Sequence, residues 1–343
     1  IGEATGQRPG PTAAPASQTV VGGPPLVAVA RFRADEETSG AFVIDLADGS
    51  TRFIHLVKVS PPSYREAKVN HNVFAALDRN TNAPAKSGEV LAGEVRSTSD
   101  AVRALFLVDT TTGAAAYLDD LEREPHRAVY RPINGRPAAA IAADDGNFAL
   151  IMRRDGSGAT DGAYLYHATT GQCIYFAHVD DLSPDPVVNF ASELPKFEGR
   201  VAAVALQAAN EATPQALLVD ERTGTIYRVG SLEREPTRIS VNTLPLGLFE
   251  FFPSGPGLEM AQRFALVPGL SDNGATDSVF IIDAATGRMA VLKGARQTAG
   301  MHLVGSTKSL SSSLPETDGD WRSLAAVPIV GSKGTTDGAW VFE

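Results

Sequence analysis

A motif of eight residues recurs five times in this chain of 343 residues. Each copy begins with a large apolar residue, continues through two mostly apolar residues to an Asp or His, and ends in Gly. The copies span Phe42–Gly49, Phe106–Gly113, Tyr164–Gly171, Leu217–Gly224 and Phe280–Gly287, and a sixth begins at Trp340. The five glycines are 64, 58, 53 and 63 residues apart. A period near 60 made of strands and tight turns indicates an array of β-blades.

Each copy is flanked by further predicted strands. A run of small and β-branched residues precedes it, as in Leu26–Ala30 and Val201–Ala205, and such a run is typical of a buried strand. A third strand follows the Gly, as in Arg52–Val57. A proline-bearing link often comes next, as in Leu121–Pro125, and we take it to mark the crossing to the next sheet, because Pro cannot donate to a ladder. A fourth strand, such as Arg238–Val241, would then open the next unit.

Four antiparallel strands repeated six times predict an all-β fold, a six-bladed β-propeller. The chain resembles the β-propeller superfamily, and its Asp-x-x-Thr-Gly turns look like those of quinoprotein-type repeats, without the Trp usual after the Gly. The resemblance concerns architecture alone and does not imply a quinone cofactor. We expect one propeller domain over residues 19–343 and a flexible tail rich in Pro and Ala over residues 1–18, which has too few apolar residues to fold.

Three recurring residues have structural explanations. The Gly of each turn is expected to have φ > 0, which Gly adopts without steric cost. The large residue at the start of each copy is expected to pack one sheet against the next. A Thr stands seven residues before the Asp position in five of six copies, with Val102 as the exception, and is expected to bond within a turn just before the strand.

Closure of the ring is the open question. The strand at 339–343 would expose an unpaired apolar edge, which folded proteins avoid. We predict that Thr19–Val21 helps to close the ring by pairing with 339–343. In the competing interpretation, Thr19–Val21 opens the first blade, and the free edge accepts a strand from a partner by β-augmentation.

Composition bounds the partners. The net charge of −10 and the absence of a basic patch argue against nucleic acid. No apolar run approaches the ~20 residues of a membrane-spanning helix, so no membrane span is expected. A first residue other than Met and the Pro/Ala-rich leader suggest an exported, periplasmic or extracellular protein.

Residues with catalytic chemistry do not form a recognisable motif, so no catalytic residue is identified. The six histidines lack metal-ligand spacing, although His71, His126 and His302 lie on or near strands expected to line the axis. Cys173 is the only cysteine and is expected to be buried. Calcium is the one cofactor considered, at the paired carboxylates Asp155 with Asp161 and Asp272 with Asp277, but a repeated turn explains them more simply.

The irregular loops at roughly 69–87, 133–145, 244–260 and 308–320 share one face, which is the expected binding face. The apolar side chains that could bind a partner are Leu248, Phe249, Phe251, Phe252, Trp340 and Phe342. We therefore expect a non-catalytic interaction module for a protein or glycan partner, or a subunit of an oligomeric assembly. The alternative is a hydrolase, lactonase or lyase with its site at the mouth of the channel.

Overall fold

The protein is described here from a computed structural model. The residues that it describes are 18–19, 26–32, 37–45, 48–57, 63–78, 90–99, 101–121, 128–143, 147–182, 185–190, 194–197, 199–210, 212–232, 239–252, 263–284, 286–297, 301–309, 325–331 and 334–342.

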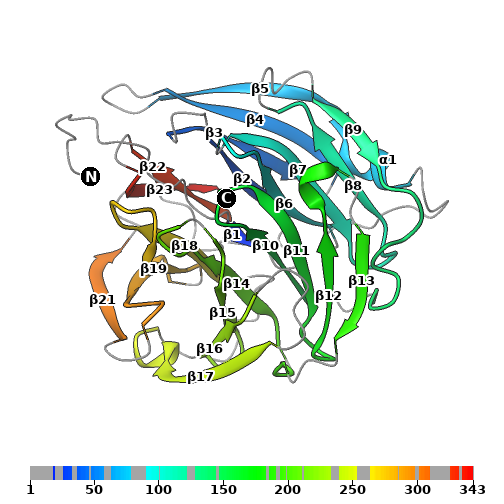
Figure 1. Ribbon diagram of the computed structural model, residues 1–343. Coiled ribbons are helices and arrows are strands. Elements are labelled where there is room, and N and C mark those ends of the chain that lie inside the picture. Colours follow the sequence, from blue (N-terminus) through cyan, green and yellow to red (C-terminus); the bar gives the residue numbers. More distant parts are fainter. Residues whose placement is uncertain are drawn as a thin grey trace.

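The chain is an all-β propeller, as predicted, and its sheets surround a central axis (Figure 1). Five sheets have four consecutive antiparallel strands. The first two of these sheets contain β2 (Leu26–Phe32), β3 (Thr38–Asp45), β4 (Ser50–Val57) and β5 (Ser63–Asn72), and then β6 (Val90–Arg96), β7 (Val102–Asp109), β8 (Ala115–Asp119) and β9 (Val129–Pro132). The next two contain β10 (Phe148–Arg154), β11 (Thr160–His167), β12 (Gln172–Ala177) and β13 (Asp185–Phe190), and then β14 (Val201–Leu206), β15 (Gln215–Asp220), β16 (Thr225–Gly230) and β17 (Ser240–Gly247). The fifth contains β18 (Phe264–Leu270), β19 (Thr276–Asp283), β20 (Arg288–Lys293) and β21 (His302–Ser309).

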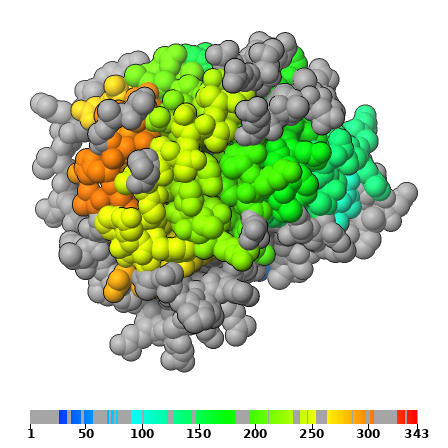
Figure 2. All heavy atoms as spheres, turned by 90° about the horizontal axis from the view of Figure 1, so that it is seen from below, coloured from blue at the N-terminus to red at the C-terminus, as the bar shows by residue number. Residues whose placement is uncertain are grey.

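A further sheet has two strands within the described residues, β22 (Ala325–Val330) and β23 (Thr336–Phe342). The remaining elements are β1 (Gln18–Thr19) and three short helices: α1 (Val73–Asp78), η2 (Val179–Asp181) and η3 (Leu248–Glu250). Successive blades, coloured from green through yellow to orange, lie side by side in Figure 2.

The apolar runs form the innermost strands. Strands β2, β6, β10, β14, β18 and β22 each contact the next, and β22 contacts β2. The sequence order predicted within a blade is therefore wrong in one respect. The strand expected to open each unit is the outermost strand of the preceding blade, since β5 pairs with β4 and β9 pairs with β8. The proline-bearing links join strands of one blade and do not cross between blades.

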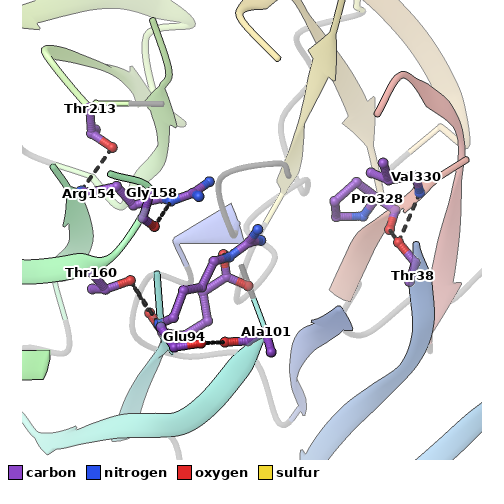
Figure 3. Close-up of polar contacts among 11 residues, drawn as sticks. Thr38, Glu94, Ala101, Arg154, Gly158, Thr160, Thr213, Pro328 and Val330 are labelled. Atoms are coloured by element: carbon purple, nitrogen blue, oxygen red, sulfur yellow. Dashed lines mark hydrogen bonds and ion pairs between the residues drawn. The ribbon is translucent and has the colours of Figure 1, made fainter. Parts of the chain in front are cut away.

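The recurring threonines link neighbouring blades. The hydroxyl of Thr160 accepts the backbone N–H of Arg96 in the preceding blade, and the hydroxyl of Thr213 accepts that of Arg154 (Figure 3). The last such link closes the ring, because Thr38 Oγ1 accepts Val330 N–H and donates to the carbonyl of Pro328. The expectation of bonds within a local turn is wrong for these hydroxyls, which bond to the end of a neighbouring inner strand.

The turn glycines have the predicted conformation. Gly113, Gly171, Gly224 and Gly287 have φ of 73°, 75°, 68° and 62°. The loops that lead back to the axis rest on the same turns: Val73 donates to the carbonyl of Gly49, and Leu248 to that of Gly224. In their described parts, the loops at 69–87 and 244–260 therefore share a face with the Gly turns, as predicted.

Within the described residues, the N-terminal strand does not pair at its predicted place. Gln18 pairs with Val204 and Thr19 with Ala203, so β1 adds to the inner edge of β14. It also contacts β6, β10 and β18, at the centre of the ring (Figure 1). Among the described residues it pairs with neither 339–342 nor the first blade. Residues 1–17, 20–25 and 343 lie outside the described residues, so of the expected tail only Gln18 is placed.

Candidate functional site

Charged side chains are buried at one end of the inner strands, where the sequence predicts only apolar packing. Arg96 is 0% exposed and Glu94 is 1% exposed. Arg96 Nε donates to Glu94 Oε1 over 2.6 Å, and its Nη2 lies 2.5 Å from the same oxygen. The guanidinium lies over the ring of Phe32, 4.0 Å from the centroid. Two charged residues inside an otherwise apolar strand, Glu94 and Arg96, are the signal that sequence reasoning missed.

A second arginine lies in the next blade. Arg154 is 2% exposed, and its Nε donates to the carbonyl of Gly158 over 2.6 Å. Its Cα partner across the sheet is Thr160, whose hydroxyl bonds Arg96. One blade further on, Gln207 is fully buried, and its backbone N–H donates to the hydroxyl of Thr276. We call Glu94, Arg96, Arg154 and Gln207 the axial polar cluster (Figure 3 labels two of them).

The opposite end of the ring carries a different set of charges. Glu221 accepts the backbone N–H groups of Arg263 and Phe264, which begin the next inner strand. Arg263 forms a two-pronged ion pair with buried Asp283, with N–O distances of 3.0 and 3.2 Å. Burial raises the pKa of Glu221 to about 7, although the two backbone donors, Arg200 and Arg263 oppose the shift. Glu221 is thus a titratable group within the link between two blades.

Strand β23 is the least buried of the six strands that carry the recurring motif, which are β3, β7, β11, β15, β19 and β23. None of the residues of β23 is buried, whereas β11, its equivalent, is buried throughout. The predicted partner residues Trp340 and Phe342 are partly buried and pack against the first blade. In the described part of the chain, β23 pairs with β22 alone.

The other predicted partner residues lie in or beside the core. Leu248 and Phe252 are buried, while Phe249 and Phe251 are partly buried around them. Phe252 contacts the ring of Phe264 with centroids 5.6 Å apart. This loop therefore lies against the next blade, and its use by a partner stays a prediction.

Two of the calcium candidates, Asp155 and Asp272, lie in similar turns, and the other two, Asp161 and Asp277, lie in the strands β11 and β19. Asp155 accepts the backbone N–H of Ser157, and Asp161 forms an ion pair with Arg153. Asp272 and Asp277 are exposed. Within the described residues no three His, Cys, Asp or Glu side chains are grouped to hold a metal ion.

The expected convergence of histidines on the axis is wrong for two of the three. His71 and His302 belong to β5 and β21, which are outermost strands. His126 lies outside the described residues. Cys173 is buried as predicted, and burial raises the pKa of its thiol above the usual range. No helix in the described parts of the chain has the length and apolarity to cross a membrane.

No protein-family model and no curated protein matches this chain. Solved structures with a similar fold include a periplasmic gluconolactonase from Pseudomonas aeruginosa, 14% identical with a TM-score of 0.43, over 78% of this chain and 67% of that one. A regucalcin from Agrobacterium tumefaciens, described as a calcium-binding protein, is 8% identical with a TM-score of 0.43, over 94% and 85%.

An auxiliary nutrient binding protein from Bacteroides thetaiotaomicron is 10% identical with a TM-score of 0.45, over 83% of this chain and 57% of that one. These likenesses concern architecture. They carry no argument about activity, metal or partner.

Proposed function

We propose that this protein is a non-catalytic binding module: a six-bladed β-propeller that presents the outer edge of β23 to an extended segment of a partner protein. In this account the β22–β23 sheet is the sixth blade. The observation that carries the proposal is the exposure of β23, when each equivalent strand of the other blades has at least five buried residues. An exposed apolar edge is a template for an added strand.

The backbone of β23 supports this use. Pro328 has no N–H, so its pairing with Ala339 is of the non-hydrogen-bonded kind. The Pro328 carbonyl instead accepts from Thr38. Because hydrogen bonding alternates along an antiparallel pair, Ala339 and Val341 direct their N–H and C=O groups away from β22. These groups are placed to bond an incoming strand.

The side chains indicate what the strand should carry. Three blades share a Gly-Ala-aromatic triplet at the same place: Gly40–Phe42, Gly162–Tyr164 and Gly338–Trp340. In the first two, an aromatic ring from the third strand covers the Gly, and a Cβ there would collide with Phe53 or Tyr175. The paired rings are 4.8 Å apart in both blades. At Gly338 the nearest atom to a Cβ would be Ile329 Cδ1, at 3.8 Å. The incoming strand is thus expected to place an aromatic residue over Gly338, beside Trp340.

The edge is also held in place before a partner arrives. Trp340 and Phe342 pack against the core that includes the first blade, while Ala339 and Val341 pack against the core between β18 and β22. A strand fixed on both faces loses little conformational freedom on pairing, which favours binding.

A synthetic peptide tests the proposal. It copies residues 172–177 of β12 with Cys173→Ser, because this strand places Tyr175 over Gly162. We expect saturable binding of this peptide to the full chain, measured by fluorescence anisotropy. The same peptide with Tyr175→Ala should bind at least tenfold more weakly. The protein variant Ala339→Pro should lose binding, because Pro removes one outward N–H without removing a bond to β22.

Equal binding by wild type and Ala339→Pro, or none by either, would contradict the proposal. Binding of the Tyr175→Ala peptide with unchanged affinity would contradict the aromatic requirement. Four further expectations stay predictions from the sequence. They are an enzyme with its site at the channel mouth as the alternative function, a glycan partner, oligomeric assembly, and export to the periplasm or cell exterior.

A further inference from the structure

The complete blades show what a strand on the edge of β23 has to carry. Opposite the aromatic residue of each covered triplet lies a second aromatic residue, Phe53 in the first blade and Tyr175 in the third. The position just before the recurring large residue has an apolar Cα partner on the third strand of all five complete blades. These partners are Ile54, Leu118, Phe176, Val229 and Leu292. A strand that covers β23 is therefore expected to place an aromatic residue opposite Trp340 and an apolar residue opposite Ala339.

The sequence of β23 itself meets these requirements when it is read in the opposite direction. All five third strands run antiparallel to the strand that they cover. An antiparallel copy of β23 centred on Trp340 places Trp340 opposite itself, and Val341 opposite Ala339. Phe342 then lies opposite Gly338. The strand that lacks a cover thus carries the residues that a cover needs.

The hydrogen-bonding groups of β23 agree with this register. Ala339 and Val341 direct their N–H and C=O groups away from β22, whereas Trp340 pairs with Val327. In the copy centred on Trp340, Ala339 of each chain faces Val341 of the other, so residues with outward-directed groups meet one another. The two Trp340 residues form the closer, non-hydrogen-bonded pair between them. A shift by one residue would set outward-directed groups against residues already bonded to β22.

We propose that a second copy of this chain supplies the strand, so that two chains form a two-fold dimer by pairing β23 with β23. This inference rests on the proposed use of the β23 edge and names its occupant. Trp340 of each copy would cover Gly338 of the other, as Tyr175 covers Gly162. The same contacts are made twice, which is the isologous arrangement of most protein dimers.

The space and the charge at the edge suit this pairing. A Cβ at Gly338 would have only Ile329 Cδ1 in contact range, at 3.8 Å, so among the described residues no ring fills the place that Tyr175 fills over Gly162. Residues 338–342 carry no charge, so their pairing does not oppose like charges, although each chain has a net charge of −10. Trp340 and Phe342 are already partly buried against the first blade, so they are fixed in place before pairing.

The dimer is expected to form in a concentration-dependent way, because only a short strand is paired in each chain. At low concentration the chain is then a monomer, free of any partner including a second copy, with the open edge described above. A peptide that occupies β23 and a second copy compete for the same groups, so each should displace the other.

Sedimentation velocity of the full chain over a concentration series tests the proposal. We expect a reversible monomer–dimer equilibrium that an excess of the residue 172–177 peptide shifts to monomer. Ala339→Pro should abolish the dimer, and Gly338→Ala should raise its dissociation constant at least tenfold, because the added Cβ meets the ring of the second copy. The matched control is Val129→Lys, because Val129 is a 49% exposed apolar residue on the outermost strand β9. This variant should dimerise as the wild type does.

The outcomes separate this inference from the proposed function. A chain that binds the peptide but stays monomeric at every concentration keeps the β23 edge as a binding site and overturns the second copy as its occupant. A dimer that Ala339→Pro leaves intact uses another surface, and this also overturns self-pairing. Absence of both the dimer and peptide binding overturns the two proposals together.

Disulfide trapping tests the register. Trp340→Cys should give a covalent dimer on mild oxidation, because the two residues 340 would have Cα atoms about 4.5 Å apart, within the range of a disulfide. Ala339→Cys should stay monomeric, because its counterpart is displaced by two residues along the neighbouring strand, more than about 7 Å away. Cys173 is buried, so the new thiol is the reactive one. Trapping of Ala339→Cys alone, or of both variants equally, would overturn the register centred on Trp340.

Discussion

The β10–β13 blade and the β22–β23 sheet carry the same Gly-Ala-aromatic triplet in different surroundings. In β11, a third strand covers the triplet, Tyr175 lies over Gly162, and every residue of the strand is buried. In the described part of the chain, the triplet of β23 lies at an edge, and no residue of this strand is buried. The difference shows that the triplet provides a surface on which another strand can pair. Whether the triplet is buried depends on the presence of that covering strand.

The largest expected difference comes from Pro at equivalent alanines. Ala163→Pro should lower the free energy of unfolding by about 3 kcal/mol or more, because it removes a buried bond to β12. Ala339→Pro should lower it by less than about 1 kcal/mol, since its N–H faces away from β22. Urea unfolding of the two variants measures both. Equal losses would show that the two strands are equally covered.

The link between two complete blades contains a titratable group, whereas the links that flank β22–β23 are the hydroxyls of Thr38 and Thr336. Burial raises the folded-state pKa of Glu221 from 4.5 to about 7, so the folded state binds the proton more tightly. Its contribution to stability is therefore present at low pH and is lost as pH rises from 4.5 to 7, by roughly 3 kcal/mol.

The variant Glu221→Gln should remove this pH dependence while keeping an oxygen to accept the backbone N–H groups. The measurement is the difference in unfolding free energy between wild type and variant at pH 4.5 and pH 7. A difference that stays constant over this range would contradict the assignment of the shift to Glu221.

A smaller contrast is expected at the triplet glycines. Gly162→Ala should destabilise the protein by about 2 kcal/mol, because the added Cβ collides with the ring of Tyr175. Gly338→Ala should change stability by less than about 1 kcal/mol, because only Ile329 is in contact range. It should nevertheless weaken the binding of an aromatic strand. Thermal unfolding compares the two variants, and a large loss at Gly338 would indicate a ring already lying there.

The smallest effect concerns the one junction without a linking hydroxyl. Val102 stands where five other blades have Thr, and it is fully buried beside the first blade. Val102→Thr should raise the free energy of unfolding by about 0.5–1 kcal/mol if its hydroxyl bonds the backbone of Phe32, as Thr160 bonds Arg96. Thr160→Val is the reciprocal control and should destabilise. Destabilisation by both would show that the first junction cannot form such a link.

The periodic features of the sequence were sufficient to predict the propeller and the turns. The glycines have φ > 0 because only Gly adopts this conformation without strain, and that requirement can be read from the sequence directly. The place of the fourth strand could not be read in this way. A strand such as β9 follows one motif and precedes the next, so spacing alone assigns it equally to either blade.

The axial polar cluster was missed for a related reason. Glu94 and Arg96 look like a charged end to an apolar strand, and only the closed ring brings them beside Arg154 of the next blade. The linking role of the threonines was missed because their partners lie a whole repeat away, as with Thr38 and Val330. The position of β1 depends on the inner edge of β14, which no local pattern indicates.

Amide hydrogen exchange along β23 tests the central claim most directly. In the free protein, Ala339 and Val341 should exchange fast, while Trp340 between them should be protected by its pairing with Val327. Addition of the residue 172–177 peptide should slow Ala339 and Val341 and leave Ala163 in β11 unchanged. Protection of Ala339 and Val341 already in the free protein would show that the edge is covered by the chain itself, and would contradict the account.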